Sequence, residues 1–197
     1  VRDEFLQTGH PNNLTVFHTA GQSDGRNGIE HLAEEGLIQR VIGSDWGLAP
    51  KMRQLIEDDK IEAYCFPQGQ LTHLYRTIAN GLPGQLSPIG IGTFVDPRLE
   101  GGKFNNKTKN KEDLVKNVTV DGQQFLYYKS IKLDYVFIRG TTADENGNIA
   151  TNEEPLKLEI LSAAQAAKAS GGKVVVQVKY LAEKDSLHPK DIVIPGY

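Results

Sequence analysis

Apolar runs rich in β-favouring residues alternate with amphipathic segments over residues 1–79. The runs are short and bounded by turn residues, and they predict strands over residues 14–18, 39–42 and 62–66. The segments between them predict helices over residues 29–35, 50–58 and 70–79, and residues 1–6 resemble the end of a further helix. This alternation is typical of the α/β class. It predicts an open, mostly parallel sheet with helices on both faces.

The second half of the chain continues with strands, one helix and a hairpin. A strand of buried type is predicted over residues 135–139 and a strong central strand over 174–179. An alanine-rich helix is predicted over 155–170, and a short last strand over 192–194. Asp121-Gly122 is a tight-turn sequence, and it lies between the apolar runs 118–120 and 124–128. We therefore expect a small antiparallel insert at about residues 118–128.

One polar segment interrupts these elements. Residues 103–116 are rich in lysine and asparagine, a composition that buries little apolar surface, and they predict a solvated, mobile loop. At 197 residues and 39% hydrophobic content, the chain is long enough to bury a core of its own. We expect a single α/β domain over residues 1–197.

The stretch from Pro88 to Gly102 contains four glycines, placed at the two ends of a short apolar segment. Glycine permits a positive φ and a close approach of the backbone, so the stretch predicts a binding loop rather than a plain strand. It is not the fingerprint of a dinucleotide-binding fold. No third glycine opens a helix after Gly90 and Gly92, and Pro97 blocks one.

Parallel sheets bind ligands at the carboxyl ends of their strands, so the turns after the first three predicted strands should meet this glycine-rich loop. The residues placed on one rim in this way are Ser44, Asp45, Gln68 and Gly90. Gln68 lies between a strand end and a helix start, where its amide could either donate to a developing oxyanion or cap the helix. The local sequence leaves both roles open.

Composition and charge argue against several classes of function. The net charge of -3 and the sequence pI of about 6.0 provide no basic stripe, which argues against nucleic-acid binding. No apolar run reaches membrane-spanning length, so we expect no membrane partner. The single cysteine, Cys65, excludes an internal disulfide and a cysteine-based metal cluster. It suits a reducing cytoplasm, where we expect the protein to act.

Three kinds of candidate residue favour structural interpretations. The five histidines never show the spacing of helical zinc motifs, so no metal site is predicted. Cys65 ends an apolar run and has no adjacent histidine, which favours a core residue over a nucleophile. Residues 144–148 predict an acidic turn in which Gly147 supplies a positive φ, rather than a catalytic carboxylate.

Several stretches, taken together, resemble the family I coenzyme A transferases, especially the propionate and acetoacetate type. These stretches are Gly36–Gly43, Trp46–Pro50, Pro67-Gln68-Gly69, Gly90–Arg98 and Arg139–Asp144. The resemblance covers nearly the whole chain and implies an open α/β domain, in agreement with the alternation of elements. It also implies coenzyme A as a substrate and no permanently bound cofactor.

The resemblance implies a two-stage transfer of coenzyme A from a short-chain acyl-CoA to a carboxylate acceptor. A glutamate attacks the thioester, the CoA thiolate returns to form a glutamyl-CoA intermediate, and the acceptor carboxylate then takes the CoA. In such an enzyme Gln68 stabilises the oxyanion. The residues implied to bind the CoA substrate are Gly69, Gly90, Gly92, Thr93 and Phe94. The implied setting is the metabolism of short-chain fatty acids and ketone bodies.

Two motifs of the family do not occur in the sequence, namely an early Gly-Gly-Phe segment and the Ser-Glu-Asn-Gly motif that carries the nucleophilic glutamate. Glu145 precedes Asn146-Gly147 but lacks the serine and follows a first-half motif, so it is not expected to be the nucleophile. We expect the first half of a CoA transferase, truncated at both ends and inactive by itself, which joins a second-half domain and forms a homo-oligomer. The alternatives are a non-catalytic fragment that binds CoA or a partner, and an acyl-CoA hydrolase on the same fold.

Overall fold

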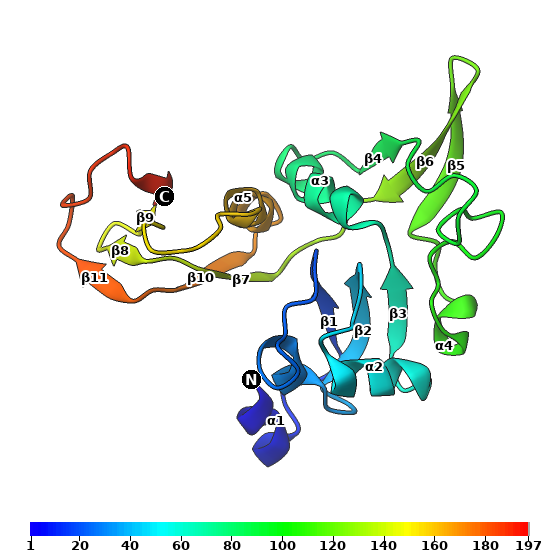
Figure 1. Cartoon of the computed structure of the whole chain (residues 1–197), viewed down its shortest axis with the longest axis horizontal. Coiled ribbons are helices and arrows are strands. Elements are labelled where there is room, and N and C mark those ends of the chain that lie inside the picture. Colours follow the sequence, from blue (N-terminus) through cyan, green and yellow to red (C-terminus); the bar gives the residue numbers. More distant parts are fainter. Residues whose placement is uncertain (197) are drawn as a thin grey trace. The chain divides into compact units, whose positions relative to one another are not determined.

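The structure is a computed structural model that describes residues 1–196, and the chain divides into two compact units (Figure 1). The first unit comprises residues 1–72 and 85–129, and the second comprises residues 73–84 and the chain from residue 130 onward. Each unit contains its own paired strands and its own buried cluster. That residues 1–197 form a single domain stays a prediction.

Three parallel strands form a sheet in the first unit, in the order β1-β2-β3 (Figure 1). These strands are β1 (Leu14–Phe17), β2 (Ile38–Gly43) and β3 (Glu62–Cys65). The helices that alternate with them along the chain are α1 (Arg2–Thr8), the 3₁₀ helix η1 (Gly28–Leu32), α2 (Pro50–Glu57) and α3 (Gln68–Ala79), whose residues from His73 onward belong to the second unit. Pro50 begins α2 as predicted, and Gly9 ends α1 in the left-handed conformation. The predicted alternation of strands and helices is confirmed.

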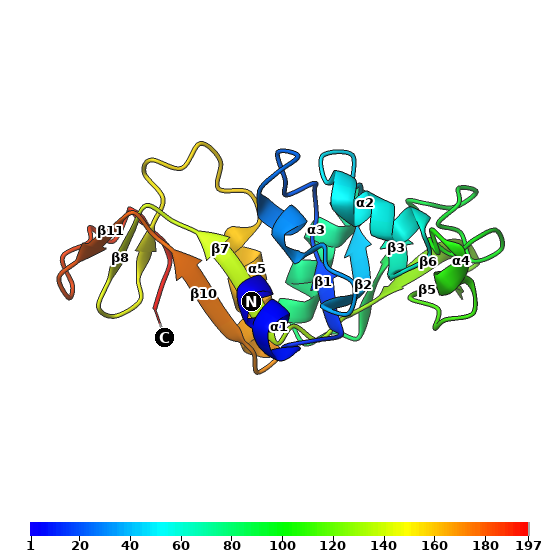
Figure 2. The ribbon, with the colours of Figure 1, turned by 90° about the horizontal axis from the view of Figure 1, so that it is seen from below.

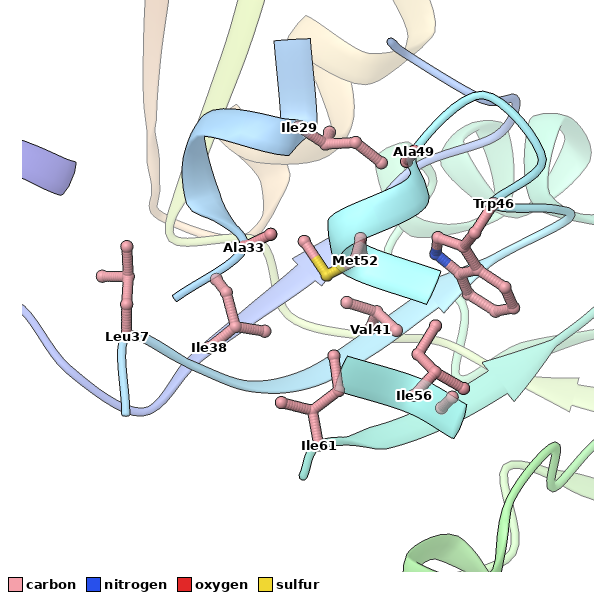
Figure 3. Packing of buried hydrophobic residues seen from close by; sticks show 11 residues of the cluster. Ile29, Ala33, Leu37, Ile38, Val41, Trp46, Ala49, Met52, Ile56 and Ile61 are labelled. Atoms are coloured by element: carbon pink, nitrogen blue, oxygen red, sulfur yellow. The ribbon is translucent and has the colours of Figure 1, made fainter. Parts of the chain in front are cut away.

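The core of the first unit lies between this sheet and the segments η1 and α2. Figure 3 shows Met52 of α2 among Ile29, Ala33 and Val41, with Ile56 one turn further along the same helix. Met52 and Ile56 are four residues apart and fully buried, so one face of α2 supplies the apolar surface that covers the sheet. A helix of eight residues depends on such packing for its stability.

A second sheet in the same unit contains the predicted hairpin, in the order β4-β6-β5. Its strands are β4 (Gly84–Ser87), β5 (Val115–Val120) and β6 (Gln123–Lys129). Asp121 and Gly122 form the turn with φ values of 50° and 78°, both in the left-handed region, as a type I′ turn requires. The antiparallel insert is therefore confirmed, and β5 begins earlier than predicted.

The polar segment 103–116 has more structure than its composition predicts. It contains α4 (Asn106–Lys109), and Asn105 caps this helix by accepting a hydrogen bond from Thr108 N at 3.2 Å. The Asn105 amide also donates to carbonyl oxygens in α2 and just before β3, both at 2.8 Å. Thr108 and Leu114 are buried. The prediction that this segment buries little is wrong, because its side chains satisfy backbone groups beside β3. Its mobility stays a prediction.

The second unit contains a two-stranded parallel sheet and a four-stranded mixed sheet. Strand β7 (Tyr135–Arg139) pairs with β10 (Lys173–Gln177), and α5 (Ile160–Ala169) packs against both strands (Figure 2). The mixed sheet has the order β11-β8-β9-β12 and consists of β8 (Thr142–Asp144), β9 (Ile149–Ala150), β11 (Tyr180–Ala182) and β12 (Ile192–Ile194). The last predicted strand is therefore confirmed as β12.

Two predictions for the second unit are wrong in detail. Helix α5 begins at Ile160 rather than at residue 155, because Leu158 has a φ of 45° that no right-handed helix can contain. Strands β7 and β10 are not a buried and a central strand, because they form a sheet of two strands. Tyr135 is 57% and Phe137 67% exposed, with a half-buried residue between them, and Val174 and Val175 of β10 are also exposed. No helix within residues 1–196 combines the length and the apolar content needed to cross a membrane.

Candidate active site

A depression of about 300 Å³ lies at the carboxyl ends of β2 and β3, entirely within the first unit. It is lined by Ser44, Cys65, Phe66, Pro67, Gln68, Ile89, Gly90, Thr93, Phe94 and Val95. The structure thus brings the strand-end turns and the glycine-rich loop together, as expected for a parallel sheet. The residues of the predicted site that do not line the depression are Asp45, Gly69 and Gly92.

Gln68 is the first residue of α3 and follows β3 after only two residues. The backbone on both sides of it is held in place, since Phe66 N donates to Gly43 O at 3.0 Å and Gln70 N donates to Pro67 O at 2.9 Å. The Gln68 side chain is exposed at the depression, and its amide has no hydrogen-bond partner among residues 1–196. The helix-capping alternative is therefore not seen in the described chain, and the amide is free to meet a ligand.

Gly90 brings the glycine-rich loop against the hairpin. Its φ is +103°, and an added Cβ would lie 2.6 Å from Tyr128 Oη and 2.9 Å from Leu126 Cδ1. The Tyr128 hydroxyl donates to the carbonyl oxygen of Ile89 at 2.7 Å. The close approach that the sequence predicts at this glycine is therefore an approach to strand β6 of the same chain.

Two large apolar side chains are exposed at the depression beside the polar Gln68. Ile89 is 55% exposed and Phe94 is 41% exposed, whereas Phe66 and Val95 line the depression from buried positions. An apolar lining with a few polar groups that fix orientation is typical of small-molecule sites. The arrangement can hold an apolar group against Ile89 and Phe94 while a polar atom meets the Gln68 amide.

Asp96 is a buried carboxylate of the glycine-rich loop that sequence reasoning missed. It accepts hydrogen bonds from Arg98 Nη2 at 2.6 Å, from Gly92 N at 2.9 Å and from Asn117 Nδ2 at 3.3 Å. The Arg98 side chain, with the other donors, holds the pKa of the Asp96 carboxyl well below its usual range, although burial opposes this shift. The position of Asp96 in a glycine-rich turn could have identified it, since aspartate side chains often accept hydrogen bonds from nearby backbone N–H groups in such turns.

Ser44 and Cys65 connect the ends of β2 and β3 at the depression. The Cys65 thiol donates to Ser44 O at 3.1 Å, and the Ser44 hydroxyl donates to Thr19 O at 2.6 Å. Burial raises the pKa of the Cys65 thiol to about 11, and the charge of Asp45 acts in the same direction. The thiol is therefore un-ionised at neutral pH, in agreement with the prediction that Cys65 is not a nucleophile.

His18 follows β1 and packs beside Trp46, with ring centroids 6.0 Å apart. Its Nδ1 donates to the carbonyl oxygen of Ala20 at 2.7 Å, because a carbonyl oxygen can only accept. Burial lowers the pKa of His18, which favours the neutral ring, although the bond to Ala20 and the charge of Asp45 oppose this shift. An added Cβ on Gly43 would overlap this ring. His18 therefore fills space at the end of the sheet and does not line the depression.

The acidic turn predicted at residues 144–148 is confirmed. Asp144 accepts hydrogen bonds from Asn146 N, Asn148 N and Asn148 Nδ2, all at 2.9 Å, and the glycine of the turn has a φ of 79°. Glu145 is exposed in this turn, in the second unit, and does not line the depression. Within residues 1–196, no group of three or more histidine, cysteine or acidic side chains is arranged to hold a metal ion.

Residues 3–197 match the sequence profile of the family described as Coenzyme A transferase. The chain belongs to this family. It is 48% identical over 198 residues to the caffeate CoA-transferase of Acetobacterium woodii and 45% identical over 198 residues to the acetate CoA-transferase YdiF of Escherichia coli strain K12. Each match covers 100% of this chain and 37% of the relative. The chain thus spans little more than a third of the length of these two CoA transferases.

A solved structure of a CoA transferase has the same fold. The acyl-CoA transferase YdiF of Escherichia coli O157:H7, in a thioester complex with CoA, matches with a TM-score of 0.95 and 45% sequence identity. The match covers 100% of this chain and 38% of that chain. The predicted α/β class, with parallel strands and accompanying helices, is therefore confirmed for this CoA transferase chain.

Proposed function

We propose that this chain forms part of the active site of an enzyme that transfers coenzyme A from a short-chain acyl-CoA to a carboxylate, with Gln68 as a donor to the oxyanion. One observation carries the proposal. In a chain of the CoA transferase family, the amide of Gln68 has no partner among residues 1–196 and lines a depression at the strand ends. The relatives named caffeate and acetate CoA-transferase support the transfer reaction.

The reaction proposed for the complete enzyme uses a nucleophilic glutamate from a second-half segment, as the resemblance to family I transferases implies. The glutamate attacks the carbonyl carbon of the acyl thioester, and the C–S bond breaks to give a CoA thiolate and an acyl-glutamyl anhydride. The thiolate then attacks the glutamyl carbonyl, which forms glutamyl-CoA and releases the acyl group as a carboxylate. The acceptor carboxylate takes the CoA by the same two steps in reverse.

Each attack places negative charge on a carbonyl oxygen, and the Gln68 amide is suited to stabilise that oxygen by a hydrogen bond. Its Nε2 carries two N–H donors, and a neutral amide needs no change of protonation to donate. Helix α3 begins at Gln68, so the positive end of the helix dipole lies at the same point. The backbone bonds on both sides of Gln68 fix the point from which its side chain extends, which reduces the reorganisation needed to meet the oxyanion.

The remaining predicted site residues are proposed to bind the substrate around this amide. Gly90, Thr93 and Phe94 line the depression, and Gly69 and Gly92 adjoin lining residues in the chain. The exposed face of Phe94 offers apolar surface to the acyl group, while the glycines leave room for the approach of the bulky CoA thioester.

We also propose that the working enzyme includes a second-half segment, acts in the cytoplasm on short-chain fatty acids or ketone bodies, and forms a homo-oligomer. The length of the relatives, of which this chain covers 37%, supports the further segment. Light scattering at high protein concentration tests the oligomer. A strictly monomeric species would contradict it.

The transfer reaction is tested with a chimera in which this chain replaces the matching part of the acetate CoA-transferase YdiF. The chimera should transfer CoA from a short acyl-CoA to acetate. Gln68→Ala should lower kcat by about 100- to 1,000-fold, the loss typical of removing one oxyanion donor. Gln54→Ala is a matched control, because Gln54 is an exposed glutamine of α2 that bonds Asp58, and this variant should keep the full rate.

Three results would contradict the proposal. If the Gln68→Ala chimera kept the full rate, Gln68 would not be a donor to the oxyanion. Release of free CoA with water as the sole acceptor, at a rate that added acetate does not change, would favour the hydrolase alternative. Tight binding of CoA to this chain alone in calorimetry, together with an inactive chimera, would favour the binding fragment.

A further inference from the structure

The glycine-rich loop contains a carboxylate that is hidden from solvent although the loop itself is exposed. Asp96 is 1% exposed, and the hydrogen bonds that it accepts use both of its oxygens. Oδ1 accepts from Arg98 N and Arg98 Nε, both at 3.0 Å, and from Asn117 Nδ2 at 3.3 Å. Oδ2 accepts from Gly92 N at 2.9 Å and from Arg98 Nη2 at 2.6 Å. Such a buried carboxylate is satisfied only because donors surround it.

These bonds join the chain before and after residues 93–95, the part of the loop that lines the depression and that we call the wall. Gly92 lies before Thr93, Phe94 and Val95, and all three of these residues line the depression. Arg98 lies after them, and its Nη1 donates to Gln124 Oε1 of β6 at 3.1 Å. Asn117 belongs to β5, so the same carboxylate also attaches the wall to the hairpin. The position of the wall therefore depends on one buried group that does not line the depression itself.

The network requires a group that only accepts hydrogen bonds. An ionised aspartate does so at both oxygens, whereas an asparagine of the same shape presents an NH₂ on one side. If the NH₂ group took the place of Oδ2, it would face the N–H donor of Gly92. If it took the place of Oδ1, it would face the donors of Arg98 and Asn117. Buried donors without acceptors are costly, so the loop would leave this conformation for part of the time.

We propose that Asp96 is a positioning residue that holds the wall Thr93–Val95 opposite Gln68 and thereby sets the affinity of the depression for the acyl group. This inference rests on the proposed CoA-transfer function. Asp96 acts through the wall and does not touch the substrate. A loop that is closed for only a fraction of the time binds its ligand more weakly by that same fraction.

The kinetic test compares Asp96→Asn with a matched control in the YdiF chimera. The control is Asp59→Asn, because Asp59 also accepts hydrogen bonds, from Asn106 Nδ2 and Lys107 N, but lies before β3 at the end of the sheet away from the depression. Asp96→Asn should raise the KM for the acyl-CoA by about tenfold and change kcat by less than about threefold. Asp59→Asn should change neither constant.

A second measurement does not depend on activity. Cys65 is the single cysteine of the chain and lines the same depression as Thr93–Val95, so its alkylation rate reports the position of the wall. In the 197-residue chain, Asp96→Asn should raise the rate of alkylation by iodoacetamide by about tenfold at fixed pH, whereas Asp59→Asn should leave it unchanged. Arg98→Met removes the donors of a half-exposed side chain and should raise the alkylation rate by a smaller factor. This variant replaces Asp96→Asn in the test if Asp96→Asn does not fold.

The outcomes separate the inference from the function on which it rests. If the chimera is active, and Asp96→Asn folds but changes neither the KM nor the alkylation rate, the inference alone is overturned. If Asp96→Asn is unfolded, an Arg98→Met variant with an unchanged alkylation rate overturns the inference in the same way. An inactive chimera overturns the proposed function and, with it, the claim about acyl affinity. Faster alkylation of Asp96→Asn would then still support the positioning of the wall.

Discussion

Cys65 N donates a hydrogen bond of 2.8 Å to Gly102 O, so the last residue of β3 is paired with the last residue of the glycine-rich loop. The pairing continues beyond this point, because Lys103 forms an isolated bridge with Tyr64 and Phe104 N donates to Ala63 O at 2.9 Å. The chain that leaves the loop thus runs along the edge of β3. The depression between Cys65 and the loop depends on this pairing.

Gly102→Ala should lower the free energy of unfolding by about 3 kcal/mol, because strain and overpacking act together. The glycine has a φ of +73°, and an added Cβ would lie 2.8 Å from Phe66 Cδ1 and 3.0 Å from Cys65 O. Urea denaturation measures the change. Gly9→Ala is the matched control, since Gly9 has a φ of +74° but no atom within 4 Å, and it should cost only about 1 kcal/mol. Equal losses in the two variants would show that close packing at Gly102 is unimportant.

Met52→Ala should destabilise the first unit by about 2–5 kcal/mol, because it leaves a cavity between α2 and β2. Met52 is fully buried in the cluster shown in Figure 3. The neighbouring Lys51→Ala removes an exposed side chain and should stay within about 0.5 kcal/mol of the wild type. Thermal or urea unfolding checks both. A loss below about 1 kcal/mol for Met52→Ala would mean that the helix closes over the cavity.

The stability difference between the wild type and Asp96→Asn should depend on pH. The pKa of the Asp96 carboxyl is lower in the folded chain than its ordinary value of about 3.9, so its ionisation stabilises the fold above that value. This contribution is lost as the pH falls from there through the folded pKa. Urea unfolding should therefore give a constant difference between pH 7 and pH 5 and a shrinking one below about pH 4. A difference that grew as the pH fell would contradict the assignment.

Alkylation of Cys65 in the wild-type chain should be slow at pH 8 and should accelerate about tenfold per pH unit up to pH 10, because only the thiolate reacts. Burial raises the pKa of this thiol to about 11. At pH 8 such a thiol is ionised to about 0.1%, against roughly 25% for an ordinary cysteine. The same chain unfolded in urea is the control and should react much faster. A rate that levelled off near pH 9 would refute the raised pKa.

The elements with a regular pattern could be predicted from the sequence, and the short ones could not. The alternation in residues 14–79 and the Asp121-Gly122 turn are local signals, and both are confirmed. Strands β8 and β9 contain three and two residues, too few to show any period. Strand β4 consists of Gly-Gln-Leu-Ser, which lacks the alternation of a half-buried strand, so its position follows from pairing with β6.

The candidate site shows the same division between local signals and long-range contacts. That Gln68 and Gly90 meet was predictable, since the carboxyl ends of parallel strands converge at one edge of the sheet. The importance of Asp96 was not, because its partner Asn117 is 21 residues away on the hairpin and becomes a neighbour only in the folded chain. The extra order of segment 103–116 was missed for the same reason, since Asn105 bonds carbonyl groups more than forty residues earlier in the chain.

The residues that line the depression come from separate stretches of the chain, yet all of them belong to the first unit. The hollow is therefore shaped by the contacts of β2, β3, the glycine-rich loop and the hairpin. Variation in the surface around Gln68 should therefore arise chiefly from substitutions in these elements of the first unit. If the proposed CoA transfer is correct, changes of acyl preference should be recorded chiefly in residues 44–68 and 89–95 and in the hairpin that supports them.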